Sequence, residues 1–185
     1  MRFLIAAALI STMAFGADAN AVKIFTDRVN EYARVRKAAT DKAPPLPKTA
    51  TPQQIENHEK ALVEAIRAAR ANAKQGDVFT PEVRPMFAAI LRNNLTGPQN
   101  KESREVAKQG NPKHDAQPNE AQPVIQVNAA YPKSAPLSSV PPALLLQLPK
   151  LPASIEYRFV GKTLVLFDNI SNLIIDYMKE AAPGL

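Results

Sequence analysis

The sequence predicts an α+β fold in which two to three N-terminal helices pack against a small C-terminal antiparallel β-meander, with a Pro-rich extended connector between them. Residues 155–178 contain three short runs rich in Val, Ile, Leu, Phe and Tyr, separated by polar turn residues, which is typical of a meander. Apolar residues recur at helical spacing in several segments upstream. Nine prolines in the 41 residues from Pro112 to Pro152 require that stretch to run mostly extended.

One turn predicts how the first two strands of the meander pair. A two-residue turn at Gly161-Lys162 pairs Val160 with Thr163, and the side chains then alternate between two faces. A third run at 173–178 supplies the last strand. A sheet of this size is not stable alone, so the upstream helices are expected to cover its more apolar face. That face is expected to carry Ile155, Tyr157, Phe159, Leu164 and Leu166.

The segment 20–40 has the pattern of an amphipathic helix. Its apolar stripe recurs at steps of three and four residues and consists of Val22, Phe25, Val29, Tyr32 and Val35. Its other faces are basic and include Lys23, Arg28, Arg34, Arg36 and Lys37. Two interpretations are open: a basic helix that binds a membrane or a partner, or the solvated outer face of a helix packed on the core.

Two further helices are expected to begin at Thr-Pro pairs. Thr51 is expected to cap the second helix, with Gln54 closing a capping box, and Gly76 is expected to end it. Thr80 is expected to cap the third helix, which Gly97 stops. A short polar helix follows at about 99–108. The expected buried stripes are Ile55, His58, Leu62, Ala65, Ile66 and Ala69 in the second helix, and Met86, Phe87, Ile90, Leu91 and Leu95 in the third.

The connector has three parts. Residues 110–121 are polar and predict a mobile loop, and residues 124–127 alternate enough to form an edge strand. Residues 141–148 predict one or two helical turns whose leucines enter the core under the meander. The chain is thus divided into a signal peptide at 1–19, a helical region at 20–110, the connector at 111–152 and the meander at 153–178, with 20–185 forming one domain.

Residues 1–19 have the pattern of a secretory signal peptide. Arg2 is followed by a short apolar run and by the small-x-small sequence Ala17-Asp18-Ala19. Cleavage is expected after Ala19, which places the protein in the periplasm or outside the cell. The alternative is an uncleaved anchor, but about a dozen apolar residues are fewer than the roughly 20 that span a bilayer. No membrane span is expected after cleavage.

The amino-acid composition limits the kinds of site and partner that this chain can have. The absence of Cys excludes disulfides, thiolate catalysis and Cys-ligated metal sites. The formal charge of +6 favours anionic partners, which outside the cytoplasm are lipid head groups and cell-wall polymers. Nucleic acid is not expected, because the aromatic residues of the basic helix lie on its buried stripe. The expected partner is an unidentified protein or an anionic component of the envelope.

The sequence offers few groups for catalysis. His58 lies on an apolar helical stripe and His114 in the predicted mobile loop, and their spacing fits no zinc motif. No Ser stands in a nucleophile elbow, and the glycines are too scattered to form a phosphate-binding loop.

Three carboxylates of the meander, those of Glu156, Asp168 and Asp176, are the candidates for a hydrolase. Asp168 is better explained as a residue that holds its own turn, and Asp176 is expected to face solvent or to meet Arg158. No catalytic residue, metal site or cofactor site is therefore predicted.

Three stretches of sequence are distinctive when they are taken together. They are KQGDVFTPEV at 74–83, YPKSAPL at 131–137 with VPP at 140–142, and EYRFVG at 156–161 with NLIID at 172–176. In these stretches the chain resembles a family of exported bacterial proteins of unknown function. The resemblance is clearest from about residue 50 onward. It implies an envelope location and a single domain, and it carries no catalytic or ligand-binding residues.

The sequence thus predicts an exported protein that acts by binding or structural interaction, through the groove between sheet and helices or through the Pro-rich connector. The alternatives are a protein of the envelope or membrane surface that uses its basic first helix, and a hydrolase that uses the carboxylates of the meander. The residues predicted for an interaction surface are Arg28, Arg34, Arg36, Lys37, Tyr157 and Arg158.

Overall fold

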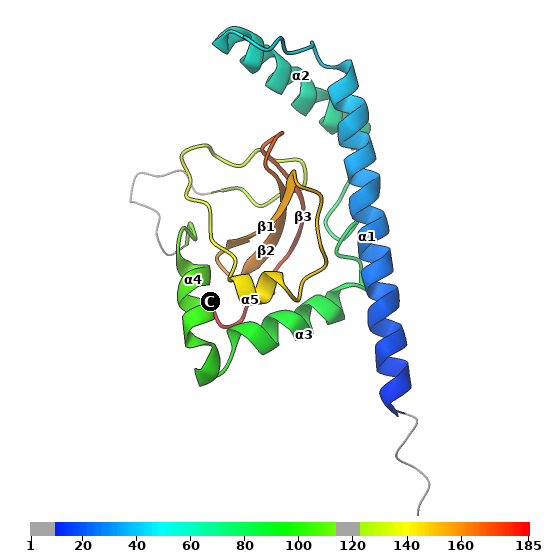
Figure 1. Cartoon of the computed structure of the whole chain (residues 1–185), viewed down its shortest axis with the longest axis vertical. Coiled ribbons are helices and arrows are strands. Elements are labelled where there is room, and N and C mark those ends of the chain that lie inside the picture. The colour runs from blue at the N-terminus through cyan, green and yellow to red at the C-terminus, as the bar shows by residue number, and fades with distance from the viewer. Residues whose placement is uncertain (1–9, 114–122) are drawn as a thin grey trace, which may run out of the picture.

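A computed structural model describes residues 10–113 and 123–185, with side chains from residue 18 onward. It confirms the α+β class, because helices precede a three-stranded antiparallel sheet at the C-terminal end (Figure 1). The helices are α1 (Ile10–Lys42), α2 (Pro52–Ala69), α3 (Arg84–Leu95), the 3-10 helix η1 (Pro98–Asn100), α4 (Lys101–Lys108) and α5 (Pro142–Leu145). The strands are β1 (Ile155–Val160), β2 (Thr163–Asp168) and β3 (Leu173–Met178). Within the described part of the chain, no helix has the length and hydropathy needed to cross a membrane.

The sheet has the strand order β1-β2-β3 and the predicted register. Val160 pairs with Thr163 across the turn, and Tyr157 pairs with Leu166. Gly161 has a φ of +58°, a left-handed conformation that a residue without Cβ adopts at little cost. This hairpin therefore forms where the turn chemistry predicts it.

The helical layer covers the face of the sheet that was predicted to be apolar. The five side chains expected on that face all lie in the main hydrophobic core. The ring of Phe25 in α1 lies 4.9 Å from that of Phe87 in α3 and 6.3 Å from that of Tyr157 in β1, and the Phe79 ring completes the cluster. One group of aromatic rings thus joins the first helix, the third helix and the sheet.

The Pro-rich connector covers the opposite face. The ring of Tyr131 lies 5.6 Å from that of Phe167, and Ala135 belongs to the same buried cluster as Val165 and Ile174. The sheet is therefore enclosed on both faces, which explains why every residue of β2 and β3 is buried.

The edge strand expected at 124–127 is not formed. The connector instead pairs with the outer edge of β3 at residues 128–131, where the Asn128 N–H donates to the Ile174 carbonyl (2.8 Å) and the Tyr131 N–H to the Asn172 carbonyl (2.9 Å). Asn128 has a φ of +63°, and this turn directs the chain onto β3 several residues later than the alternating pattern suggests.

The predicted helix starts differ in outcome. Thr51 caps α2 as predicted, with Oγ accepting the Gln54 N–H (3.3 Å) and Gln54 Oε1 accepting the Thr51 N–H (2.8 Å). Thr80 does not cap α3, because the Thr80 carbonyl accepts the Arg84 N–H in a turn and the helix begins at Arg84. Pro85 then lies in the first turn, where a missing N–H costs no helical hydrogen bond.

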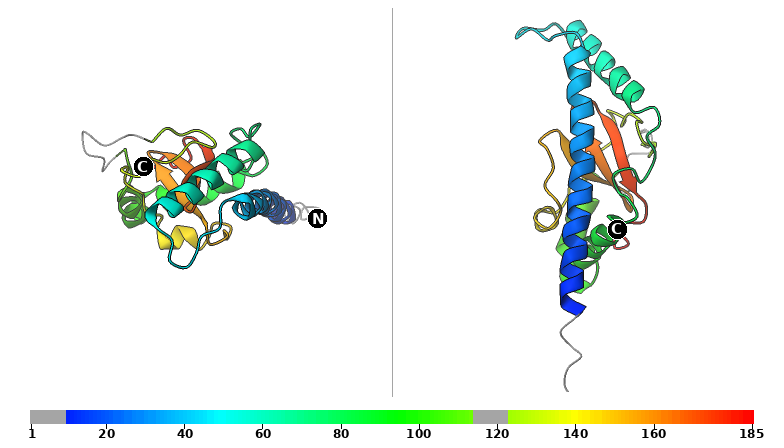
Figure 2. Two further views of the ribbon diagram at one scale, coloured as in Figure 1. Left: turned by 90° about the horizontal axis from the view of Figure 1, so that it is seen from above. Right: turned by 90° about the vertical axis from the view of Figure 1, so that its right-hand side faces the viewer.

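Helix α1 is longer than predicted and forms one side of the molecule along most of its length (Figure 2). It contains the predicted cleavage point after Ala19. Phe25, Val29 and Tyr32 are buried as predicted, but Val22 is 39% exposed and Ala21 is buried in its place.

The second helix and the predicted mobile loop differ from expectation in part. Leu62 and Ile66 are buried, but Ile55 is exposed because the first turns of α2 lie beyond the end of the sheet (Figure 1). Residues 114–121 of the predicted loop, with His114, lie outside the described residues. The residues just before them are held in place by the fully buried Asn111. Its side-chain oxygen accepts the Gly161 N–H (2.7 Å), and its side-chain nitrogen donates to the Gly161 carbonyl (3.0 Å).

Candidate functional site

The two edges of the sheet differ, because the connector pairs with β3 whereas β1 is open at its centre. The Ile155 N–H donates to the Pro152 carbonyl (2.9 Å) and the Phe159 N–H to Ser138 Oγ (2.5 Å). Main-chain groups of a strand point to the same edge at every second residue, so the N–H and carbonyl of Tyr157 also face outward. Among the described residues neither of these two groups has a hydrogen-bonding partner.

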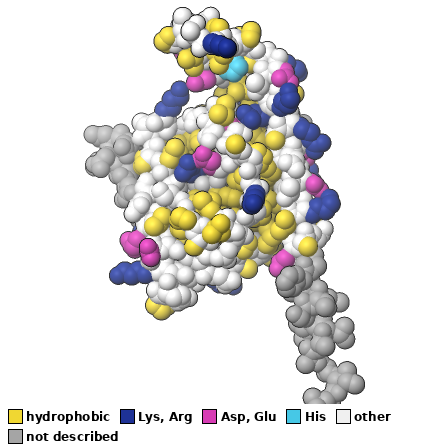
Figure 3. Space-filling view, viewed as in Figure 1, with side chains coloured by type: hydrophobic (Ala, Val, Ile, Leu, Met, Phe, Trp, Pro, Cys, Tyr) yellow, Lys and Arg dark blue, Asp and Glu magenta, His cyan; other side chains and the backbone are white. Residues whose placement is uncertain are grey.

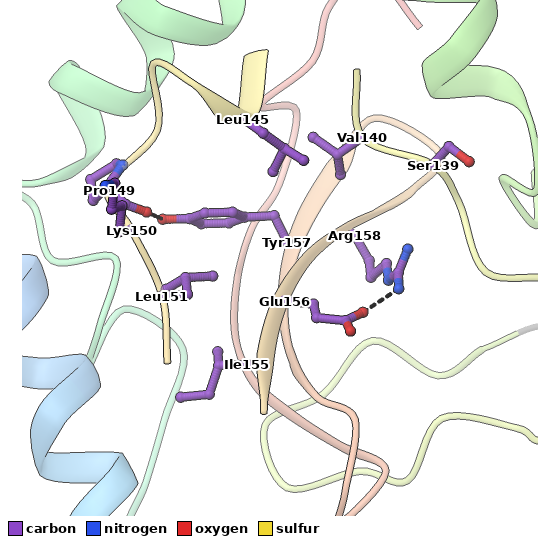
Figure 4. Close-up of a pocket in the computed structure, with 10 residues that line it drawn as sticks. All are labelled: Ser139, Val140, Leu145, Pro149, Lys150, Leu151, Ile155, Glu156, Tyr157 and Arg158. Carbon is purple, nitrogen blue, oxygen red and sulfur yellow. Dashed lines mark hydrogen bonds and ion pairs between the residues drawn. The ribbon is translucent and has the colours of Figure 1, made fainter. Parts of the chain in front are cut away.

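A groove of about 400 Å³, here called the β1 groove, runs along this open edge. Residues 155–158 form its floor, residues 139–140 and 149–151 form its walls, and Leu145 of α5 stands over it. Figure 4 shows the side chains of Ile155 and Tyr157 on one side of β1 and those of Glu156 and Arg158 on the other. The groove therefore presents an apolar side and a charged side to any molecule that lies along the edge.

Helix α5 provides the apolar side. Leu144 and Leu148 are buried as predicted, but Leu145 is 46% exposed and Leu146 is 88% exposed. Figure 3 shows hydrophobic side chains gathered on this face, over α5 and the segment that follows it. The hydroxyl of the buried Tyr157 donates a hydrogen bond to the Pro149 carbonyl (2.9 Å), which joins the wall of the groove to its floor. Burial raises the pKa of this phenol above its usual range.

Glu156 and Arg158 provide the charged side. Arg158 Nη1 donates to the Ser138 carbonyl (2.8 Å), and Nη2 pairs with the Glu156 carboxylate. Glu156 Oε1 also accepts a hydrogen bond from Asn169 Nδ2 (2.7 Å). The two side chains are 31% and 26% exposed, so an acid and a base are fixed on either side of Tyr157 and remain partly accessible.

Asp176 is buried, and the prediction that it faces solvent or meets Arg158 is wrong. Its carboxylate accepts the N–H groups of Gly76 (2.9 Å), Val78 (2.8 Å) and Phe79 (2.8 Å). Gly76 has a φ of +93°, which lets the chain turn around the carboxylate. Gly76 therefore does not end α2, which stops at Ala69. Two of the distinctive stretches, 74–83 and 172–176, meet at this point.

Asp168 holds its turn as predicted and is also fully buried. One carboxylate oxygen accepts the N–H groups of Ile170 (2.9 Å) and Ser171 (3.1 Å), and the other accepts the Tyr32 hydroxyl (2.6 Å). Burial, and then the negative charge of Asp168, raise the pKa of Tyr32 above its usual range. Of the three carboxylates considered for a hydrolase, Asp168 and Asp176 thus serve the fold, and Glu156 alone lines the β1 groove.

The six residues predicted for an interaction surface lie in three places. Arg28, Arg34 and Lys37 lie on the exposed side of α1. Arg36 turns inward, with Nε 3.8 Å from the Asp168 carboxylate. Tyr157 and Arg158 lie together in the β1 groove. Of the six residues, only Tyr157 and Arg158 line the β1 groove.

The basic face of α1 is partly neutralised by acids of the same helix. Three exposed ion pairs at helical spacing lie along it, and they are Lys23–Asp27 (2.6 Å), Arg28–Glu31 (3.3 Å) and Lys37–Asp41 (2.9 Å). This pattern favours the solvated outer face over the membrane-binding helix.

Two other hollows are bounded by side chains rather than by an open strand edge. One, of about 390 Å³, lies between α1 and the end of α2, and the other, of about 540 Å³, lies between α2 and the β2–β3 turn. Among the described residues no three His, Cys, Asp or Glu side chains come together as a metal site. His58 is half-buried with Nδ1 2.7 Å from the Pro44 carbonyl, as expected for a packed or rim residue.

Sequence reasoning missed Ser138 and the walls of the groove. The available signal was the run Leu144-Leu145-Leu146, because three consecutive residues of a helix cannot all face one core. Comparison with protein-family models, curated proteins and solved structures finds no match to this chain.

Proposed function

We propose that this chain is an exported protein, periplasmic or secreted, that acts by binding an extended segment of another protein along the open edge of β1. The observation that supports this proposal is the unpaired main chain of Tyr157 on the floor of the β1 groove. An extended peptide can add a strand to such an edge through main-chain hydrogen bonds, while neighbouring side chains provide specificity.

The shape of the groove favours a narrow ligand. Pro152 and Ser138 accept the N–H groups of Ile155 and Phe159, so Tyr157 is the residue of this edge whose outward N–H and carbonyl both lack a partner among the described residues. Walls at 139–140 and 149–151 rise beside it. A recessed edge of this kind is protected against pairing with another folded sheet and admits a single extended chain.

The binding proposal is tested with a library of short synthetic peptides that carry an apolar central residue and randomised flanks. Binding is measured by NMR titration of the uniformly ¹⁵N-labelled protein. Leu145→Lys places a charge in the lining of the groove and should abolish binding. Leu146→Lys is the matched control, because Leu146 is exposed but does not line the groove, and it should leave binding unchanged.

The ligand provides a second control. Methylation of the central peptide nitrogen removes the N–H that would bind the Tyr157 carbonyl and should abolish binding, whereas methylation of the preceding residue, whose N–H points away from β1, should not. Absence of binding by the whole library contradicts the proposal. A concentration-dependent dimer that Leu145→Lys disrupts would place a second copy in the groove and would also contradict it.

Export is part of the same proposal, and the signal-peptide pattern of residues 1–19 supports it. Residues 18–20 are exposed, and among the described side chains of α1 the first buried one is that of Ala21. Cleavage after Ala19 would therefore remove none of the described core side chains. Intact mass and fractionation of the protein from its native host should give a soluble species that begins at Asn20, and a membrane-bound species that retains Met1 would contradict export in this form.

A further inference from the structure

We infer that the β1 groove selects the order of charges in its peptide: an acid, then an apolar residue, then a base, bound antiparallel to β1. This inference rests on the proposed function and adds a ligand class to it. It arises from Glu156 and Arg158, which carry opposite charges and lie on either side of Tyr157, the residue of this edge whose N–H and carbonyl are both unpaired in the described part of the chain.

The direction of the peptide follows from Tyr157, whose outward N–H and carbonyl are both unpaired among the described residues. In antiparallel pairing, one residue of the incoming strand exchanges both hydrogen bonds with the residue opposite. Tyr157 offers one outward N–H and one outward carbonyl, so a single peptide residue satisfies both. In parallel pairing the same two groups would bond to two different peptide residues, which requires a longer stretch of chain to lie flat between the walls.

This register places each peptide side chain. The residue before the central one lies opposite Arg158, and the residue after it lies opposite Glu156, with Cβ atoms about 4.5–5.5 Å apart. Both neighbours share the charged side of β1, where Arg158 is fixed by the Ser138 carbonyl (2.8 Å) and Glu156 by Asn169 (2.7 Å). An acid therefore fits the first position and a base the last, and the reverse order sets like charges opposite each other.

The central side chain lies on the other side of the strand. It shares this side with Tyr157 and meets Leu145 and Leu151, which line the groove there (Figure 4). An apolar residue is favoured because its burial against these side chains removes hydrocarbon from water.

Two peptides with blocked ends, Gly-Gly-Glu-Val-Arg-Gly-Gly and Gly-Gly-Arg-Val-Glu-Gly-Gly, test the charge order. They have the same composition and net charge, so non-specific electrostatic attraction is matched. The wild-type protein should bind the first more tightly by on the order of tenfold. The double variant Glu156→Arg/Arg158→Glu keeps the total charge and should reverse the preference, and Glu156→Gln should reduce it without reversal if the double variant does not fold.

The possible outcomes separate the two proposals. Equal binding of both peptides, or a preference that the double variant does not reverse, overturns the charge-order inference while the proposed function stands. A wild-type preference for the Arg-Val-Glu order overturns the antiparallel register. Failure of both peptides and of the whole library overturns the proposed function and the inference together.

Discussion

Replacement of Asp176 by Asn changes one atom group at the centre of a buried contact. The Asp176 carboxylate accepts four N–H groups, with Gly76 and Tyr177 on Oδ1 and Val78 and Phe79 on Oδ2. Asn has one acceptor oxygen and a donor NH₂ in place of the other. In either orientation of the amide, two of the four N–H groups lose their acceptor and face another donor.

The expected cost follows from these two lost acceptors. A buried donor left without a partner costs about 1–3 kcal/mol, so Asp176→Asn should lower the free energy of unfolding by about 2–6 kcal/mol. Domains of ordinary size have about 5–15 kcal/mol in total, so this is a large fraction. The loss of the negative charge adds to the effect. Burial lowers the pKa of Arg70, and the charge of Asp176 partly offsets this lowering, so the variant holds the charged form of Arg70 less favourably in the folded state.

Equilibrium unfolding in urea measures this difference, with Asp27→Asn as the matched control. Asp27 makes an exposed ion pair with Lys23, and loss of such a pair changes stability by about 0–1 kcal/mol. Amide exchange of Val78 and Phe79 should also accelerate in Asp176→Asn. If the stability of this variant lies within about 0.5 kcal/mol of wild type, the carboxylate does not hold the 76–79 loop and the account of this contact is wrong.

Two further predictions concern the core and its tyrosines. Leu144→Ala should lower the free energy of unfolding by about 2–5 kcal/mol, and Leu146→Ala should change it by less than about 0.5 kcal/mol, because only Leu144 is buried; equal effects in urea unfolding would contradict the placement of α5. Burial raises the pKa of Tyr131 to about 12 and those of Tyr32 and Tyr157 above the usual range. Because these folded-state pKa values exceed the unfolded value of about 10, their contribution to stability is fully present below pH 10 and is lost as the pH rises toward 12 and above. Urea unfolding at increasing alkaline pH, with phenolate absorbance recorded in parallel, should show that loss, and ionisation of all tyrosines at pH 10 without unfolding would contradict it.

Local patterns predicted the parts of the fold that depend on neighbouring residues. The Gly161-Lys162 turn and the alternation around it specify the β1–β2 register, and the Thr51 capping box lies within one helical turn. Both signals act between residues that are neighbours in sequence, and the packing around them agrees with them, whereas the equally short signal at Thr80 is overridden by a turn.

The candidate site depends on contacts between distant segments, which a single sequence does not reveal. The Asp176 carboxylate accepts the N–H of Gly76, which is 100 residues away in sequence. Gly76 was expected to end a helix, but its positive φ serves this turn around the carboxylate instead. Ser138 closes one end of the open edge through Phe159, 21 residues away. The face occupied by Tyr157 was predicted, but the openness of its main chain depends on where the connector turns.

Hydrogen exchange at the Tyr157 amide tests the central claim most directly. In the free protein, this amide should exchange faster than that of Phe159, which is bonded to the buried Ser138. Saturation with the Glu-Val-Arg peptide should slow exchange at Tyr157 and leave that at Phe159 unchanged. An amide of Tyr157 that is already protected in the free protein, or one whose exchange does not change when peptide binds, would show that the edge of β1 is not the binding site.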